Sequence, residues 1–396
     1  AEIAAHWALA PDYFALGPNA EAVSRVAAQA KTDPVGVDTT VKPRTAAIIV
    51  VDREVDLMTP SVSRDSWGRV KRGTSVLRLP RTPTEISMPL DEESRHLLAI
   101  LTPEDAPAMH QVDIHVLRDA MESRFPDRER EPVAKVEDRL VPGTHVDVPV
   151  RLYRPSIEGK LPVLVYFHGG GWVLGSLETH DAICRAFANE ASCVVVSVDY
   201  RLAPEHRFPS GLEDCQTVVR WVQAGADELG VDRERIAVGG DSAGGNLAAV
   251  IANWNRDENG PPLCHQLLIY PVLDASQASE SYRENADGYL LTALGMKMFW
   301  DLYLGEASAM DSPLASPAQV ADLTGLPPAT VLTAQYDPLR DEGEIYAERL
   351  KTAGNQVALR RWDGVFHGFV GFADRLTKGS EAILFSAQRL RESFDG

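Results

Sequence analysis

The chain has 396 residues, 44% of them hydrophobic, and a formal net charge of −18. This length accommodates one large domain with an appended segment. The acidic balance argues against nucleic acids and anionic membranes as partners, and no apolar run is long enough to span a bilayer. The four cysteines lack metal-site spacing and indicate reduced thiols, so the expected location is the cytoplasm.

Charge is distributed unevenly along the chain. Residues 1–87 hold eleven Lys and Arg against ten Asp and Glu, whereas the rest of the chain is strongly acidic. Within this segment we expect a helix over Ala20–Ala30 and a strand over Thr45–Val51. The basic stretch Arg64–Arg81 is either a solvated arm or an arm that docks on the acidic body or on a second subunit. We therefore predict that residues 1–87 form an N-terminal extension that serves as a lid, a docking arm or a dimerisation arm.

The pattern becomes helical near Met88. Apolar residues at helical spacing (Leu97, Leu98, Leu101) and the stretch Val112–Ser123 predict two helices within residues 88–132. From residue 133 to residue 396, short apolar runs bounded by turns alternate with helical patterns. This alternation predicts an α/β domain with a mainly parallel central sheet and helices on both faces. His145–Tyr153 alternates apolar and polar residues, which predicts a half-exposed strand. The short apolar runs are Pro162–Phe167, Cys193–Val198, Arg235–Gly239, Leu267–Val272, Ala329–Ala334 and Gln356–Trp362.

One gap between the predicted strands is much longer than the others. Between Asp274 and Pro327 the chain carries Tyr, Phe, Trp, Leu and Met at helical spacing and no strand pattern. We interpret this segment, at about residues 275–312, as a helical insertion over the C-terminal edge of the sheet.

A glycine-flanked serine follows the buried run Arg235–Gly239. In Gly240-Asp241-Ser242-Ala243-Gly244 the spacing is G-x-S-x-G, the pattern of a nucleophile elbow. Such a turn raises the serine hydroxyl above the sheet, and only small flanking residues allow strand and helix to approach closely. The pattern alone is weak, but the strand before it and the helix after it strengthen the interpretation of Ser242 as a nucleophile.

A glycine-rich loop follows the strand predicted over Pro162–Phe167. Its sequence is His168-Gly169-Gly170-Gly171-Trp172, which matches an HGGG-type oxyanion loop. Bare glycine N–H groups can approach a substrate oxygen closely, and the donors would be Gly170, Gly171 and Ala243. A phosphate-binding P-loop is excluded, because no Gly-Lys-Ser/Thr follows.

A serine nucleophile needs a base and an acid that orients the base. Two histidines follow Ser242. His265 precedes a strand and so lies at the wrong end of the sheet, whereas His367 follows the last strand. Asp274 and Asp337 both follow predicted strands; we interpret Asp274 as a turn or cap residue and choose Asp337 as the acid.

From about Met88 onward, the chain resembles the hormone-sensitive-lipase-like family of α/β-hydrolases, which includes bacterial carboxylesterases. The motifs that carry the resemblance run in the family's order: His168–Trp172, Asp199–Glu205, Gly240–Gly245, Asp337–Asp341 and His367–Phe369. Residues 1–87 depart from the family pattern.

The resemblance implies an α/β-hydrolase fold with a catalytic triad of Ser242, Asp337 and His367. It also implies a helical cap, built from the helices after Met88 and the insertion after Asp274, and a structural role for Asp199–Glu205 beneath the oxyanion loop. A homodimer is expected, because many bacterial members dimerise.

We therefore predict a serine carboxylesterase that hydrolyses short- to medium-chain esters of small molecules through an acyl-enzyme. The same triad acting on a lactone, a carbamate or an amide is the alternative, and a ligand-binding receptor on a hydrolase scaffold is a remote one. No metal or organic cofactor is implied. The candidate substrate-binding residues are Trp172, Leu174, Tyr200, Tyr289, Leu290, Leu339 and Phe369.

Overall fold

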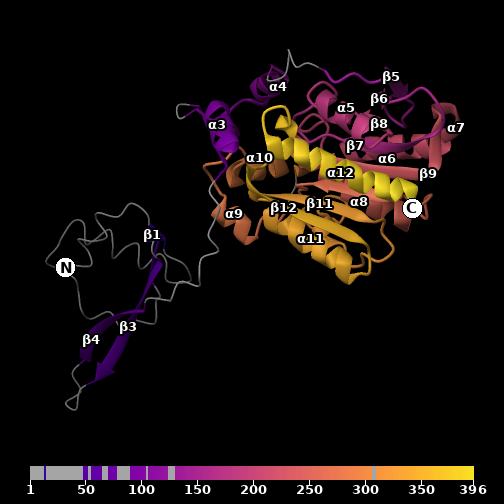
Figure 1. The fold of residues 1–396 in the computed structure, drawn as a ribbon. Helices are drawn as coiled ribbons and strands as arrows, with labels where there is room; N and C mark the ends of the chain where they lie inside the picture. The colour runs from indigo at the N-terminus through magenta and orange to yellow at the C-terminus, as the bar shows by residue number, and fades with distance from the viewer. Residues whose placement is uncertain are drawn as a thin grey trace. The chain divides into compact units, whose positions relative to one another are not determined.

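The computed structural model describes residues 90–103, 106–123, 130–305 and 309–396, together with the backbone of four strands earlier in the chain. The chain divides into two units, Ala1–Ser87 and Met88–Gly396 (Figure 1).

The four strands of the first unit form an antiparallel sheet in chain order. The predicted strand at Thr45–Val51 is present as β2, while the predicted helix at Ala20–Ala30 lies outside the described residues. The first part of the basic stretch falls in a hairpin of β3 and β4, in which Arg64 pairs with Val70. The sequence analysis did not predict this hairpin. The strands are β1 (Tyr13–Phe14), β2 (Ile48–Val51), β3 (Val55–Arg64) and β4 (Val70–Leu77).

The second unit is built on an eight-stranded sheet in the order β12-β11-β10-β9-β7-β8-β6-β5. The strands from β12 to β8 run parallel to their neighbours, and β6 and β5 complete the sheet with antiparallel pairings. The predicted mainly parallel sheet is therefore confirmed. The strands are β5 (Lys135–Val141), β6 (Val148–Arg154), β7 (Leu161–Phe167), β8 (Val194–Val198), β9 (Val231–Asp241), β10 (His265–Ile269), β11 (Ala329–Tyr336) and β12 (Val357–Phe366).

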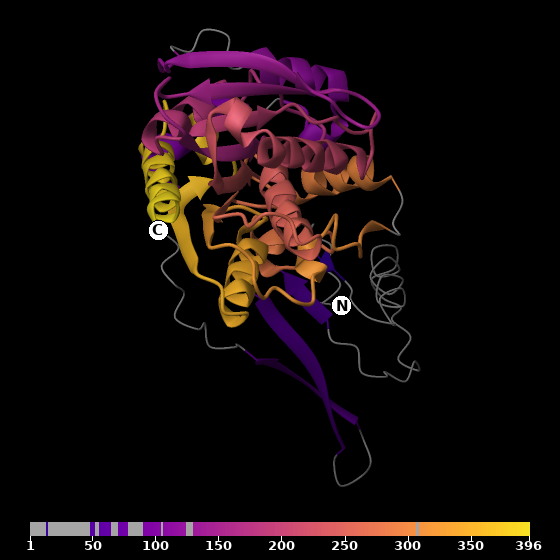
Figure 2. The same ribbon diagram turned by 90° about the vertical axis from the view of Figure 1, so that its right-hand side faces the viewer.

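Helices cover both faces of this sheet (Figures 1 and 2). Helices α6, α8 and α11 contribute to the core on one face, and α5 and α12 to the core on the other. The helices are α3 (Glu92–Leu101), α4 (Ile114–Ser123), α5 (Asp181–Glu190), α6 (Ser210–Ala224), α7 (Ala226–Leu229), α8 (Ala243–Asp257), α9 (Glu280–Glu284), α10 (Ala293–Leu304), α11 (Arg340–Thr352) and α12 (Thr377–Asp395), with short 3₁₀ turns η1 (Met109–Gln111), η3 (Pro317–Gln319) and η4 (Phe369–Phe372).

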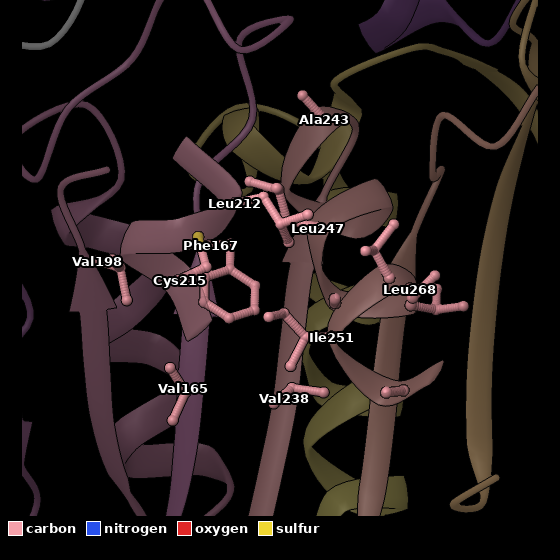
Figure 3. Close-up of a cluster of buried hydrophobic side chains, with 14 of the residues drawn as sticks. Val165, Phe167, Val198, Leu212, Cys215, Val238, Ala243, Leu247, Ile251 and Leu268 are labelled. Atoms are coloured by element: carbon pink, nitrogen blue, oxygen red, sulfur yellow. The ribbon is translucent and has the colours of Figure 1, made fainter. Parts of the chain in front are cut away.

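The apolar run of β7 explains why both faces need covering. Successive side chains of a strand point to opposite faces. Val163, Val165 and Phe167 enter the core beneath α6 and α8, whereas Leu164 and Tyr166 enter the core beneath α5 and α12. Figure 3 shows the first of these cores, where side chains of β7, β8, β9 and β10 meet those of α6 and α8.

Two strand ends differ from the prediction in a way that affects the site. Strand β10 ends at Ile269, so Asp274 lies beyond the strand rather than at its end. Strand β12 continues to Phe366, so His367 follows it directly. Between residues 275 and 327, the described residues contain helices and no strand, as predicted.

Among the described residues, no helix combines the length and the apolar character needed to cross a membrane.

His265 is the first residue of β10 and lies in the core at the end of the sheet opposite to the serine. Its side chain is buried, with Nδ1 2.8 Å from Ser393 Oγ and Nε2 3.0 Å from Thr330 Oγ1. Burial lowers the pKa of His265 to about 3, because the charged ring would lose its hydration. In the folded protein His265 is therefore a neutral, structural residue.

We expect His265 to make the protein sensitive to acid. Between pH 6.5 and pH 3 the unfolded chain binds a proton at this ring that the folded chain does not bind. The unfolding free energy should therefore fall as the pH falls, by up to about 1.4 kcal/mol per pH unit from this residue. In His265→Gln, urea unfolding between pH 4.5 and 6 should show a shallower pH dependence than in the wild type. Equal slopes for the two proteins would contradict this assignment.

Candidate active site

Ser242 stands at the turn between β9 and α8. Its backbone has φ 55° and ψ −116°, a strained conformation for a residue other than glycine. The turn is wedged against the end of β7, since a Cβ on either Gly240 or Gly244 would clash with the carbonyl oxygen of Phe167. The G-x-S-x-G spacing is thus required by the close packing of the turn on β7.

The side chains of Ser242, His367 and Asp337 form a hydrogen-bonded chain. His367 Nε2 lies 3.0 Å from Ser242 Oγ, and His367 Nδ1 lies 2.7 Å from Asp337 Oδ2. All three are buried. With Nδ1 donating to the carboxylate, Nε2 is left to accept the serine proton. The structure therefore brings together the three residues that the sequence analysis selected.

Asp337 is held by groups other than the histidine. Its Oδ1 accepts a hydrogen bond from the Leu339 N–H at 2.9 Å. Its main-chain carbonyl accepts one from Asn285 Nδ2, just after α9, at 3.1 Å. The rejected candidate Asp274 instead accepts a local hydrogen bond from the Ser276 N–H, as expected of a turn residue.

Two glycines of the loop after β7 adopt backbone conformations that other residues rarely adopt. Gly170 and Gly171 adopt positive φ angles of 111° and 61°. At either position a Cβ would clash, with the Leu174 backbone at Gly170 and with the Phe299 ring at Gly171. Among the described residues, no acceptor pairs with the N–H groups of Gly170 and Gly171. Ala243 opens α8, where the first N–H groups lack partners within the helix.

The segment after β8 supports this loop from below. Tyr200 donates its hydroxyl proton to the His168 carbonyl at 2.7 Å, and its ring stacks on that of His168 at 4.3 Å. The Ala203 N–H donates to the Trp172 carbonyl at 2.9 Å. Burial lowers the pKa of His168 to about 3, so this ring is neutral in the folded protein.

A cavity of about 150 Å³ opens above Ser242. Its polar lining includes Ser242, His367, Asp241 and His180, and most of the exposed lining surface is apolar. Such a cavity admits an apolar ligand and presents its polar group to the serine. The apolar wall residues are Met109, Met121, Leu174, Ile183, Leu290, Leu291, Met296, Phe299 and Phe372.

Two of the seven candidate substrate-binding residues, Leu174 and Leu290, line this cavity. The other five do not. Trp172 stacks on Tyr303 at 4.2 Å, and Tyr289 stacks on Tyr336 at 4.9 Å. The remaining three are Tyr200, which donates to the His168 carbonyl beneath the glycine loop, and the buried core residues Leu339 and Phe369.

Helix α10 shows why the sequence did not predict most of the residues that line the cavity. Its apolar residues recur at helical spacing, but the spacing does not distinguish its two apolar sides. Met296 and Phe299 line the cavity, while Trp300 and Tyr303 pack on Trp172. The described residues contain no group of three or more side chains arranged to hold a metal ion.

The strand order, the serine turn after β9 and the hydrogen-bonded Ser242, His367 and Asp337 define the class of α/β-hydrolases. A family model for the alpha/beta hydrolase fold matches residues 164–371. The carboxylesterase NlhH of Mycobacterium tuberculosis is 47% identical over 256 residues, which cover 63% of this chain and 80% of the relative.

Two further comparisons agree. An arylesterase of Saccharolobus solfataricus is 37% identical over 290 residues, covering 72% of this chain and 93% of the relative. The structure of a hyperthermophilic esterase from the archaeon Pyrobaculum calidifontis matches with a TM-score of 0.73 at 44% identity, covering 77% of this chain and 99% of that one. The chain belongs to the hormone-sensitive-lipase-like family of α/β-hydrolases, which confirms the predicted family and the predicted enzyme class, carboxylic ester hydrolase.

We expect Gly244→Ala to destabilise the protein. The added Cβ would clash with the Phe167 carbonyl, a backbone group that no side-chain rotation can move away. Overpacking of this kind costs about 1–3 kcal/mol of unfolding free energy. The matched control is Gly371→Ala, where an added Cβ meets no heavy atom within 4 Å. Urea unfolding measures both; equal stability of the two variants would show that the elbow does not depend on this contact.

Proposed function

We propose that this chain is a serine carboxylesterase that hydrolyses short- to medium-chain esters through an acyl-enzyme. The observation that carries the proposal is the position of His367, whose ring bridges Ser242 Oγ and the Asp337 carboxylate. The names of its relatives, carboxylesterase and arylesterase, support an ester as the substrate.

In the first half of the reaction, His367 Nε2 takes the Ser242 proton as Oγ attacks the ester carbonyl. Asp337 stabilises the imidazolium that forms. The N–H groups of Gly170, Gly171 and Ala243 donate to the oxyanion of the tetrahedral intermediate. His367 then protonates the leaving alcohol. In the second half, His367 activates a water, which releases the acid and restores Ser242.

The shape of the cavity supports small apolar acyl groups. A volume of about 150 Å³ with walls mainly of Met, Leu, Ile and Phe offers little space for a long chain and few partners for a charged one. The helices α3, α4, α9 and α10 form the cap in this proposal. Met109, Met121, Met296 and Phe299 from the same parts of the chain line the cavity.

Three further proposals rest on other grounds. All four cysteines are free thiols, three of them buried, which supports a reducing compartment such as the cytoplasm. A homodimer rests on the family resemblance. The extension, residues 1–87, serves as a lid, a docking arm or a dimerisation arm; deleting it should alter substrate range or stability if it is a lid, and should leave the kinetics with simple esters unchanged if it binds a partner.

We expect Ser242→Ala to abolish hydrolysis of p-nitrophenyl esters. Without the nucleophile, kcat should fall by at least about 10⁴-fold, because binding and the oxyanion donors alone catalyse weakly. The wild type should be most active on chains from acetate to about octanoate and inactive on palmitate. The control is Ser386→Ala, a buried serine on α12 that donates to the Ala382 carbonyl.

A folded wild type that hydrolyses none of these esters would refute the carboxylesterase proposal, and lactones, carbamates and amides would be assayed next. Full activity in Ser242→Ala would refute the assignment of the nucleophile. Ligand binding without turnover of any of these substrates would instead favour the receptor alternative.

We expect Phe299→Ala to shift the preference toward longer acyl chains. Phe299 lines the cavity and lies directly over Gly171, so its removal enlarges the space beside the oxyanion loop. The ratio of kcat/KM for decanoate to that for acetate should rise by about tenfold, the lower end of what one methylene contact is worth in a hydrophobic pocket. Tyr303→Phe is the control, because Tyr303 lies on the same helix and packs on Trp172 instead. An unchanged ratio in Phe299→Ala would contradict the prediction.

A further inference from the structure

A buried carboxylate outside the triad lies beside the nucleophile. Asp241 is the last residue of β9 and immediately precedes Ser242, and its side chain is almost fully buried. Its Oδ1 accepts a hydrogen bond from the Tyr166 hydroxyl at 2.8 Å and one from the Gly169 N–H at 3.1 Å. His180 Nε2, at the cavity wall, lies 3.4 Å from the same oxygen and accepts a second, longer hydrogen bond from the Gly169 N–H at 3.3 Å.

Burying an ionised carboxylate costs folding free energy unless hydrogen-bond or charge partners compensate for the lost hydration. Burial alone would raise the pKa of Asp241, but the nearby His180 and the hydrogen bonds from His180 and Tyr166 hold that pKa below its ordinary value. Asp241 is therefore ionised at neutral pH, and its charge strengthens the hydrogen bonds that it accepts.

One of those hydrogen bonds reaches the oxyanion loop. Gly169 directly precedes Gly170 and Gly171, the proposed oxyanion donors. The contact between Gly169 and the Asp241 carboxylate is close, since a Cβ on Gly169 would clash with Asp241 Oδ2. Gly169 therefore packs against the Asp241 carboxylate and also donates its N–H to that carboxylate.

The proposed catalytic groups lie on two separate segments. Ser242 and Ala243 follow β9, while Gly170 and Gly171 follow β7, and the two strands pair side by side up to Phe167 and Gly240. Beyond that pair, the main-chain ladder no longer sets the distance between the turn and the loop. The side chain of Asp241 connects them at the first position past the end of the ladder.

We propose that Asp241 is a positioning residue that fixes the oxyanion loop relative to Ser242 through the Gly169 N–H. The inference rests on the proposed serine esterase function. Oxyanion donors are effective only when they are placed in advance where the charge develops. Loss of the Asp241 contact therefore weakens transition-state binding more than substrate binding.

The test compares Asp241→Ala, which removes the acceptor, with Asp241→Asn, which keeps an acceptor oxygen for the Gly169 N–H. Three quantities are measured: kcat and KM with p-nitrophenyl butyrate, the Kd of a trifluoromethyl ketone that forms a tetrahedral adduct, and the thermal midpoint. The matched control is Asp181→Asn. Asp181 is also a buried carboxylate, and it accepts a hydrogen bond from the Tyr153 hydroxyl at 3.0 Å.

In Asp241→Ala, kcat should fall by about 10- to 100-fold, less than the loss on deleting an oxyanion donor itself. The ketone should bind more weakly by a similar factor, while KM changes by less than about threefold. In Asp241→Asn, both kcat and the affinity for the ketone should be close to their wild-type values. Asp181→Asn should lower the thermal midpoint without changing kcat.

The inference is wrong if folded Asp241→Ala binds the ketone as tightly as the wild type. It is also wrong if a folded Asp241→Asn variant loses as much kcat as the alanine variant. If the alanine variant does not fold, a loss of kcat of more than about 100-fold in Asp241→Asn refutes the inference. A wild type inactive on every ester would instead refute the proposed function, and that result is distinct from a loss confined to the Asp241 variants.

Discussion

The site depends on one close packing contact, between the turn after β9 and the end of β7. Gly240 and Gly244 lie against the Phe167 carbonyl with no space for a Cβ. The same contact places Ser242 beside the glycine loop that follows Phe167 directly, so the proposed nucleophile and the proposed oxyanion donors share one support. The positive φ of Ser242 is the strained conformation that this packing imposes.

The site contains a set of polar groups and a set of apolar cavity walls. Strands β7, β9, β11 and β12 deliver the polar groups at the carboxyl edge of the sheet, where parallel strands converge. Met109, Met121, Met296 and Phe299, which lie apart from these strands in the sequence, supply apolar walls. The sheet thus determines the chemistry, and the surrounding helices determine which group fits above it.

Different residues of the site were predictable to different degrees. Ser242, Asp337 and His367 could be selected because each follows the end of a predicted strand, and the carboxyl ends of parallel strands lie at one edge of the sheet. The residues of the pocket walls could not be selected in this way. Trp172 and Tyr289 show the same apolar pattern as Phe299, yet Trp172 packs on Tyr303 and Tyr289 packs on Tyr336. Which side of a segment faces a cavity depends on how the segment packs, and periodicity does not report packing.

The α/β class, the mainly parallel sheet, the serine turn and the glycine loop could all be predicted from the amino-acid sequence. These features arise from local patterns: continuous apolar runs, glycine spacing and the residues that end strands. The cavity walls, the burial of Asp241 against Gly169 and the neutral core position of His265 became evident only from the folded chain. Each of these depends on contacts between residues far apart in the chain, and one sequence contains no record of such pairs.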